Sequence, residues 1–270
     1  MNAQTHPRTP TRVAVDAQAL AQLYAAPEIL RVVNVWDAAS ARVVAELPGT
    51  RAIATAGHSI AASHGYADGE QIPLDLMLAS IGRIAAAAEH FPVTADLDGG
   101  YGDVSETVRR AIGVGVSGAN IEDRMRPFGE SVAIMRAAVR TGEQEGIAFA
   151  LNARTDALVR NPERPRAEAI AEAIERGRAY RDEGATCIFV PGVLSEEDTL
   201  ALVAGIGPQA VSVIGLPGAL TAAAYEKLGV ARISYGPMPQ NVALTALKRL
   251  GESLHGDGVI PAETEQLNNF

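Results

Sequence analysis

The stretch TADLDGGYGD, residues 94–103, places Asp96 and Asp98 two positions apart and follows them with three glycines. Side chains two apart along a strand point to the same face, so these carboxylates would lie close together. Like charges at that spacing are costly unless protons or a cation lie between them. Carboxylate oxygens suit Mg²⁺, which can polarise a keto or carboxylate oxygen of a substrate. The stretch predicts either a magnesium site or a simple strand-to-helix turn in which Asp98 and Asp103 are turn and cap residues.

Further charged side chains end other apolar runs of the chain. Asp68 lies in GYADGE, Glu122 in NIED and Arg154 in LNARTDA. If the ends of these runs meet, Arg154 can hold a substrate carboxylate by a bidentate contact beside the acidic groups. The set predicts a site for a small acid with a chelating oxygen pair. The structural alternatives are a turn at Asp68, a solvated ion-pair cluster at Glu122 and an ion pair between Arg154 and Asp156.

Other candidate residues stand at or just after the ends of apolar runs. A lone histidine is more often structural than catalytic, and aromatic side chains can line a pocket or simply pack. We expect the catalytic groups among Asp68, Glu122, Arg154 and His58. Expected substrate contacts, besides Arg154, are Trp36, Thr55, Ala56, Gly57, Tyr101, Asn152 and Ser212.

These residues must be positioned by a repeating pattern of strands and helices. Eight runs that are apolar on both faces are each followed by a helical pattern, which is typical of buried parallel strands. Eight such units favour a (β/α)₈ barrel of the TIM type over an open sheet, and no G-x-G-x-x-G motif follows the first run. In such barrels the chemistry lies at the carboxyl ends of the strands. The expected strands are 31–36, 52–57, 92–98, 118–123, 147–154, 186–192, 210–215 and 231–236.

Composition excludes several classes of protein. The net charge is −9 and the basic residues are scattered, which argues against a nucleic-acid partner. No apolar run is long enough to span a membrane, and the first residues lack the apolar core of a signal peptide. The single cysteine, Cys187, excludes an intramolecular disulfide. We expect a cytoplasmic protein with a flexible tail at 1–12 and one barrel domain over 13–270.

Taken together, the motifs resemble the isocitrate lyase / phosphoenolpyruvate mutase superfamily, and within it the short bacterial phosphoenolpyruvate phosphonomutase-like branch. The resemblance covers about residues 30–240, and the motifs are specific as a set rather than singly. The matching stretches, in the family's order, are NVWDAASARVV, AIATAG, GYADGE, TADLDGGYGD, NIED, LNARTDA, IFVPGV and GVARISYGP.

This resemblance implies a barrel that uses Mg²⁺, with Mn²⁺ as the alternative ion, and a ligand resembling an α-keto acid. It implies that Asp96 ligates the metal directly and that Asp98, Asp68 and Glu122 hold it through waters. Arg154 would contact the substrate, and the backbone amides around Ala56, Gly57 and His58 would cradle a carboxylate or enolate oxygen. The family commonly forms homodimers and homotetramers, often with the last helix exchanged between subunits.

The chain departs from the family where the reaction is selected. Lyases of the family carry a K-K-C-G-H-type lid after the fourth strand, and phosphonomutases carry a lid with lysine and asparagine. Residues 123–131, DRMRPFGES, contain neither cysteine, lysine nor asparagine. Small residues are usual where His58 stands, and asparagine is usual where Ser212 stands. A lyase or decarboxylase acting on an oxaloacetate-like acid is therefore favoured over a phosphonomutase.

Three hypotheses follow from the sequence. The first is a Mg²⁺-dependent enzyme that breaks or rearranges a C–C or P–C bond of a small α-keto acid or phosphonate. The second is a non-catalytic relative that keeps the metal site. The third is another barrel enzyme, and a Schiff-base aldolase is disfavoured because both lysines, Lys227 and Lys248, fall in predicted outer helices.

Overall fold

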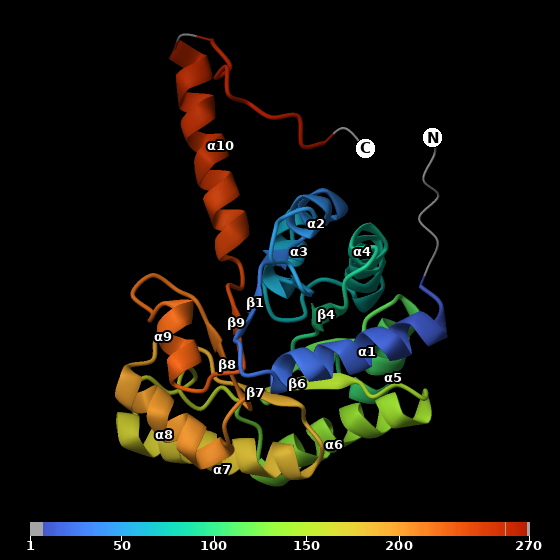
Figure 1. Cartoon of the computed structure of the whole chain (residues 1–270), viewed down its shortest axis with the longest axis vertical. Coiled ribbons are helices and arrows are strands. Elements are labelled where there is room, and N and C mark those ends of the chain that lie inside the picture. The colour runs from blue at the N-terminus through green and yellow to red at the C-terminus, as the bar shows by residue number, and fades with distance from the viewer. Residues whose placement is uncertain (1–7, 257, 269–270) are drawn as a thin grey trace.

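The apolar runs form parallel strands that surround a common axis (Figure 1). The computed structural model describes residues 8–256 and 258–268. Within these residues nine short strands pair in the order β1-β9-β8-β7-β6-β5-β4-β3-β2. Their bounds are β1 Leu30–Val32, β2 Asn34–Val35, β3 Ile53–Thr55, β4 Val93–Asp96, β5 Gly118–Glu122, β6 Ala150–Arg154, β7 Cys187–Phe189, β8 Val211–Ile214 and β9 Arg232–Ser234.

The first expected strand is split into β1 and β2, and this split closes the barrel. β1 pairs with β9, whereas β2 pairs with β3, so one segment joins both edges of the sheet. Asn34 fastens this junction: its Nδ2 donates to Thr55 O at 2.9 Å, and its Oδ1 accepts from the backbone N of Tyr235 and Gly236. The predicted (β/α)₈ barrel is therefore confirmed, with its first strand in two pieces.

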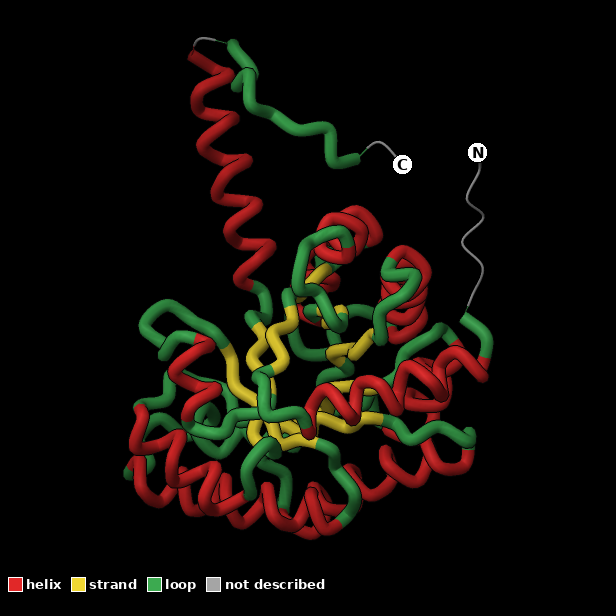
Figure 2. The backbone as a smooth tube through the Cα atoms, in the orientation of Figure 1, coloured by secondary structure: helices red, strands yellow, loops and turns green. Residues whose placement is uncertain are grey.

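Helices follow the strands and form the outer layer (Figure 2). Local sequence explains where two of them begin. Asp103 Oδ1 accepts from Glu106 N at 3.0 Å, and Ser195 and Asp198 form a reciprocal capping box. α3 was not predicted as a helix. The bounds are α1 Pro10–Ala25, α2 Ala38–Ala45, α3 Gly57–Ser63, α4 Leu74–Ala87, α5 Val104–Gly113, α6 Phe128–Gln144, α7 Arg166–Asp182, α8 Glu196–Ile206, α9 Ala222–Lys227 and α10 Met238–Gly256.

The helix α1 covers the amino ends of the strands. Its residues Leu20 and Tyr24 pack in one buried cluster with Leu30, Ala150 and other residues at the starts of strands. The end that α1 covers is therefore opposite to the end at which chemistry is expected.

The start of α1 corrects the expected tail at 1–12. The helix begins at Pro10 and Thr9 caps it, because Thr9 Oγ1 accepts from Arg12 N. Arg8 is already anchored by an ion pair with Asp16 at 2.6 Å. Residues 8–12 therefore belong to the helix and its cap, and residues 1–7 lie outside the described residues.

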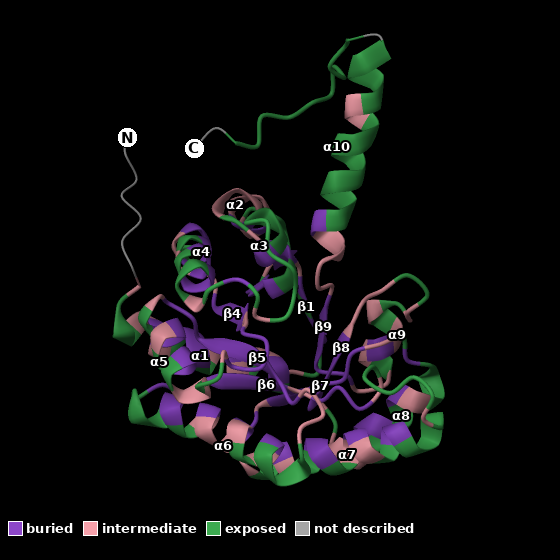
Figure 3. Ribbon diagram, turned by 180° about the vertical axis from the view of Figure 1, so that it is seen from behind, coloured by how far each residue is buried: buried purple, intermediate pink, exposed green. Residues whose placement is uncertain are grey.

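The last helix, α10, extends away from the barrel (Figures 1 and 3). Gln240 near its start is buried, but Leu247 is 62% exposed and Val242 70% exposed. Among the described residues, no helix combines the length and the apolar character needed to cross a bilayer. Beyond its first turn, the apolar side chains that α10 leaves exposed among the described residues point to a contact outside this chain.

Candidate active site

A cavity of about 270 Å³ opens at the carboxyl ends of the strands. It brings together six of the predicted residues from five separate segments: His58, Asp68, Asp96, Asp98, Glu122 and Arg154. The other lining residues are Asn34, Gly69, Asn120, Arg160, Phe189, Pro191, Ile214, Ser234, Gly236 and Pro237.

Asp96 ends β4 and is held by the end of β3. Its backbone N donates to Thr55 Oγ1 at 3.0 Å, and its Oδ2 accepts from Gly57 N at 3.0 Å. A side chain on Gly57 would place its Cβ 3.1 Å from the same Oδ2, so the close approach favours glycine. Burial raises the pKa of the Asp96 carboxyl, opposed by Arg154 and reinforced by Glu122.

Asp98 faces the same cavity from a strained turn. Its φ of 50° lies in the left-handed region, which aspartate tolerates better than most residues. Burial, followed by the charges of Asp96 and Glu122, raises the pKa of Asp98 to about 8. Asp98 therefore forms the predicted turn, and its carboxyl group also faces the cavity. With this raised pKa, the carboxyl group is stabilised at neutral pH either by a bound proton or by a nearby cation.

These carboxylates fit a cation held mainly through waters. Among the described residues, no three His, Cys, Asp or Glu side chains lie close enough together to ligate one ion directly. Asp68, Asp96, Asp98 and Glu122 nevertheless line a single cavity. Mg²⁺ commonly keeps several waters and takes only one or two carboxylates directly. The donor set therefore suits Mg²⁺ with few direct protein ligands.

Opposite charges are concentrated beside β5 and β6. Arg154 Nη1 lies 2.9 Å from Glu122 Oε2, and Arg154 Nε lies 2.7 Å from Asp156 Oδ1. Arg160 contacts the same two acids, with its Nε 3.1 Å from Asp156 Oδ2. The expected ion pair between Arg154 and Asp156 is thus present, and Arg154 lines the cavity as well. Its guanidinium also lies 5.8 Å from the centre of the Phe189 ring.

His58 and Asp68 form the outer part of the cavity. His58 Nδ1 lies 3.3 Å from Asp68 Oδ2, and both side chains are about half exposed. Since α3 begins at Gly57, His58 lies in the first turn of that helix. The two residues are therefore accessible to solvent as well as to a ligand.

The segment after β5, residues 123–131, packs against two neighbouring loops. Arg124 pairs with Glu122 at 2.8 Å and with Glu70 at 3.0 Å. Glu70 Oε1 in turn accepts from the backbone N of Gly99 and Tyr101. A Cβ on Gly99 would lie 2.7 Å from Arg124 Nε. Two loops that carry cavity residues are therefore joined through one arginine and one glutamate.

The other predicted substrate contacts lie beside or below the cavity. Thr55 supports Asp96, and Ala56 N donates to Val35 O. Tyr101 Oη lies 3.5 Å from Asp98 Oδ2. Asn152 and Ser212 are fully buried and lie 3.3 Å apart, with Asn152 Nδ2 donating to Ser212 Oγ. Substrate contact by these residues stays a prediction.

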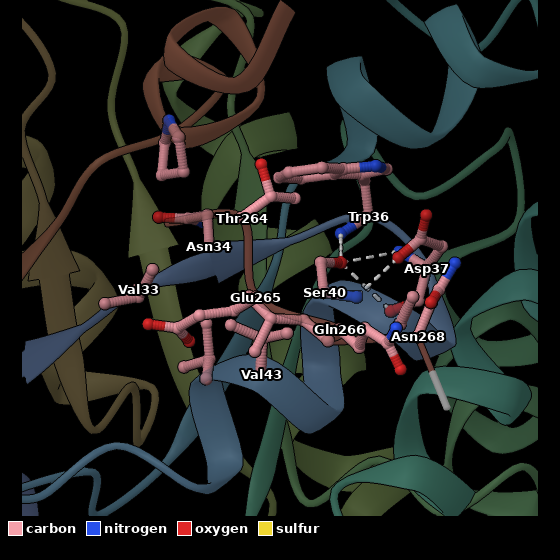
Figure 4. A pocket seen from close by; sticks show the side chains of 14 residues that line it. Val33, Asn34, Trp36, Asp37, Ser40, Val43, Thr264, Glu265, Gln266 and Asn268 are labelled. Atoms are coloured by element: carbon pink, nitrogen blue, oxygen red, sulfur yellow. Dashed lines mark hydrogen bonds between the residues drawn. The ribbon is translucent and has the colours of Figure 1, made fainter. Parts of the chain in front are cut away.

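Trp36 lies in a different place. It lines a larger groove of about 630 Å³ together with Asp37, Ser40, Val43 and residues 264–268 of the C-terminal segment (Figure 4). Asn34 lines both this groove and the cavity. Trp36 therefore does not line the cavity that holds Asp68, Asp96, Asp98 and Glu122.

Sequence reasoning missed three residues of this region: Asn120, Arg160 and Glu70. Asn120 precedes Glu122 by two positions on β5, so strand alternation alone places it on the same face. Arg160 follows Asp156 by four positions in a turn and pairs with it. Glu70 pairs with Arg124, which lies 54 positions later in the sequence. The contact between Glu70 and Arg124 has no local sequence pattern, whereas Asp156 and Arg160 have a local spacing of four positions.

The sequence also matches a known family. The family profile described as phosphoenolpyruvate phosphomutase matches residues 20–255. A protein of Corynebacterium glutamicum, provisionally named 2-methylisocitrate lyase 2, is 30% identical over 197 residues, which are 67% of this chain and 61% of that protein. The chain thus spans less than two thirds of that relative's length.

Solved structures show the same architecture. A protein from Burkholderia cenocepacia J2315, provisionally named a phosphonomutase, has a TM-score of 0.83 at 36% identity over 89% of this chain and 99% of that one. An oxaloacetate acetylhydrolase in complex with its product oxalate has a TM-score of 0.82 at 29% identity over 93% and 91%. The barrel and these similarities show that the chain belongs to the phosphoenolpyruvate mutase / isocitrate lyase family of enzymes.

Proposed function

We propose that this chain is a Mg²⁺-dependent lyase or decarboxylase that cleaves a C–C bond of a small 2-oxo acid and leaves a pyruvate-type enolate. One observation carries this proposal: Asp68, Asp96, Asp98 and Glu122 line the same small cavity as Arg154 and Arg160. Such a cavity suits a ligand that chelates a cation through one pair of oxygens and offers a further negative charge to an arginine.

The metal would be held by Asp96 directly and by Asp98, Asp68 and Glu122 through waters. Mn²⁺ is the alternative ion because it accepts the same oxygen ligands. When bound, the ion would supply Lewis-acid polarisation of the 2-oxo group, which stabilises negative charge on that oxygen.

Arg154 would orient the substrate. Two of its nitrogens are fixed by Glu122 and Asp156 at 2.9 and 2.7 Å, which sets the plane of the guanidinium. A planar donor in a fixed orientation can align a carboxylate so that the bond to be broken faces the cavity. The volume of about 270 Å³ limits the substrate to a small acid.

A proton must reach the enolate carbon after cleavage. Residues 123–131 contain no cysteine or lysine for this purpose, and Arg124 holds the segment against Glu70 and Glu122. His58 and Asp68 are the exposed titratable pair in the cavity, so one of them or solvent would deliver the proton. Because cleavage of an oxaloacetate-like acid needs only this one proton, it is favoured over phosphonomutase chemistry. The similarity to the structure of an oxaloacetate acetylhydrolase supports this choice of substrate.

The functional protein would be a homodimer or homotetramer built on α10. Leu244 and Leu247 are 53% and 62% exposed on the part of α10 that follows its anchored first turn. Exchange of this helix between subunits would bury it, as the family resemblance implies.

The test is a release assay for pyruvate with and without Mg²⁺. The panel would be oxaloacetate, 2-methylisocitrate, 2,3-dimethylmalate, phosphonopyruvate and phosphoenolpyruvate, with oxalate as inhibitor. Metal-dependent, oxalate-sensitive pyruvate from oxaloacetate supports the proposal. Pyruvate from 2-methylisocitrate or 2,3-dimethylmalate alone would make the substrate a 2-hydroxy acid, whose hydroxyl carbon becomes the pyruvate carbonyl, and would contradict cleavage of a 2-oxo acid. Pyruvate from phosphonopyruvate alone would contradict C–C cleavage. Oxalate binding with no turnover of any compound would favour a non-catalytic relative.

A further inference from the structure

A layer of polar side chains lies inside the barrel directly below the cavity. Its centre is Arg232 on β9, which is 1% exposed. Arg232 Nη1 donates to Tyr24 Oη at 2.7 Å and to Asn120 Oδ1 at 3.3 Å. Asn152 Nδ2 donates to the same Asn120 oxygen at 2.7 Å. Asn120 Oδ1 thus accepts two hydrogen bonds, one from Arg232 and one from Asn152.

This arrangement fixes which way the Asn120 amide points. A guanidinium can only donate hydrogen bonds, so the amide atom that faces Arg232 must be the oxygen. The amide nitrogen is therefore turned away from Arg232. Asn120 is 9% exposed and lines the cavity, and no acceptor for its Nδ2 is found among the described residues. Because Asn120 Nδ2 is not sealed from solvent, this donor can be reached from the cavity by a ligand or water.

The charge of Arg232 strengthens this donor. Within the described part of the chain, no carboxylate lies within ion-pair distance of Arg232, and its guanidinium contacts Tyr24 and Asn120. The Asn120 amide has its oxygen toward this charge and its N–H₂ toward the cavity. The amide dipole is aligned with the field of the arginine, and both present positive potential to the cavity.

We propose that Asn120 is a catalytic residue, whose Nδ2 donates a hydrogen bond to the substrate oxygen on which negative charge develops, and that Arg232 is the positioning residue that orients it. This inference rests on the proposed function, because it assigns a donor to the oxygen of the enolate. The step involves no proton transfer by Asn120: the N–H bond stays intact and the hydrogen bond shortens as charge grows. Fixed donors aimed at a developing oxyanion are among the largest contributions to catalysis.

The decisive variant is Asn120→Asp. Its carboxylate keeps an oxygen that can accept from Arg232 and from Asn152, but the donor toward the cavity becomes an acceptor. We expect kcat to fall by about 10²-fold or more. We also expect the Kd of oxalate for the Mg²⁺-loaded protein to rise at least about tenfold, by repulsion between oxygens. Stability and Mg²⁺ affinity should be no lower than those of the wild type. Asn241→Asp, at an exposed position of α10, is the matched control and should change neither kcat nor the Kd of oxalate.

The role of Arg232 is tested by a double-mutant cycle with Asn120, because the single Arg232 variant does not separate positioning from other effects. Arg232→Met should raise the Kd of oxalate in the wild-type background but add little in an Asn120→Ala background, because a positioning residue acts through the residue it orients. Circular dichroism selects folded variants, and Arg232→Gln, which also removes the charge, replaces Arg232→Met if that variant fails to fold. Additive losses would overturn the role of Arg232.

The outcomes separate this inference from the proposed function. Wild-type protein that binds no oxalate in the presence of Mg²⁺ would contradict the proposed function itself. Wild-type protein that binds oxalate, together with an Asn120→Asp variant that binds it equally well and keeps its kcat, would overturn the inference alone.

Discussion

Arg154 and Glu122 are register partners across β5 and β6, and their side chains meet at 2.9 Å between Nη1 and Oε2. The strand pairing therefore brings the arginine of one segment to the acid of another, 32 positions earlier in the sequence. Asp156 holds the other side of the same guanidinium at 2.7 Å. A guanidinium fixed on two sides by buried acids is a prearranged anion-binding group.

The first prediction concerns the planar shape of Arg154. Arg154→Lys keeps the positive charge but loses the fork that contacts Glu122 and Asp156 and that, in the proposed function, also contacts the substrate. We expect kcat/KM to fall by about 10²-fold, since a bidentate site does not accept lysine as an equivalent. The matched control is Arg164→Lys, which contacts Glu168 and Glu172 outside the cavity and should retain activity. Steady-state kinetics of the wild type and both variants measure the effect. A kcat/KM of Arg154→Lys equal to that of the wild type would exclude substrate orientation by Arg154.

The second prediction concerns the support of Asp96. Thr55→Val keeps the shape of the side chain but leaves the backbone N–H of Asp96 without its acceptor. We expect a loss of about 1–3 kcal/mol in the free energy of unfolding, together with weaker Mg²⁺ binding. Thr155→Val is the control, because the buried Thr155 hydroxyl has no described hydrogen-bond partner and its loss should be neutral or stabilising. Urea titration and Mg²⁺ calorimetry measure both. A neutral result at Thr55 would show that this hydrogen bond does not position Asp96.

The third prediction is a pH dependence of stability in metal-free protein. The pKa of Asp98 is about 8 in the folded state and about 4 when unfolded, so the folded state binds the extra proton between these values. The stabilisation is complete below pH 4 and is lost as the pH rises through 8. In EDTA, the free energy of unfolding should fall by a few kcal/mol from pH 5 to pH 8.5, on the order set by the linkage relation.

Asp98→Asn provides the comparison for this titration. Asparagine tolerates the left-handed backbone at this position, and it removes the proton uptake of residue 98. Its stability should therefore depend less steeply on pH over the same range. Urea titrations at each pH measure both proteins, and parallel curves would mean that Asp98 does not titrate as described.

The fourth prediction concerns assembly through α10. Leu247→Glu places a charge on the exposed apolar side of this helix and should dissociate the expected dimer or tetramer. Lys248→Glu changes the charge of the neighbouring position, which is 77% exposed and pairs weakly with Glu252, and should leave assembly intact. Sedimentation velocity at micromolar concentration measures both variants. A wild-type monomer would contradict assembly through α10.

Much of the fold was predictable because barrel strands and helices follow local patterns. Runs such as 186–192, in which residues 187–190 are apolar on both faces, indicated buried strands, and Ser195 and Asp198 carry a capping signature that the structure confirms. The split of the first strand was not predictable, since it depends on the stagger needed to close the barrel. The start of α1 at Pro10 was missed because Arg8 is anchored by Asp16, a contact that composition does not reveal.

Strand ends carry most of the site residues that were predicted, although Asp68 was predicted from a loop and Asn120 was missed on a strand. Asp96, Glu122 and Arg154 each end a strand, so barrel geometry brings them together. Glu70 reaches the same region from a loop by a contact with Arg124, 54 positions away, which no sequence spacing encodes, whereas Arg160 lies only four positions after Asp156. Trp36 also ends its run, but its side chain lines the groove beside the C-terminal segment instead.

The most direct test of the account is oxalate binding by calorimetry, with and without Mg²⁺, in the wild type and in Asp96→Ala. We predict that the wild type binds oxalate only with Mg²⁺. We also predict that Asp96→Ala loses both oxalate binding and Mg²⁺-dependent turnover while its circular dichroism spectrum is unchanged. Oxalate binding that is equally tight without Mg²⁺, or a folded Asp96→Ala variant with normal turnover, would contradict a metal-assisted enolate site.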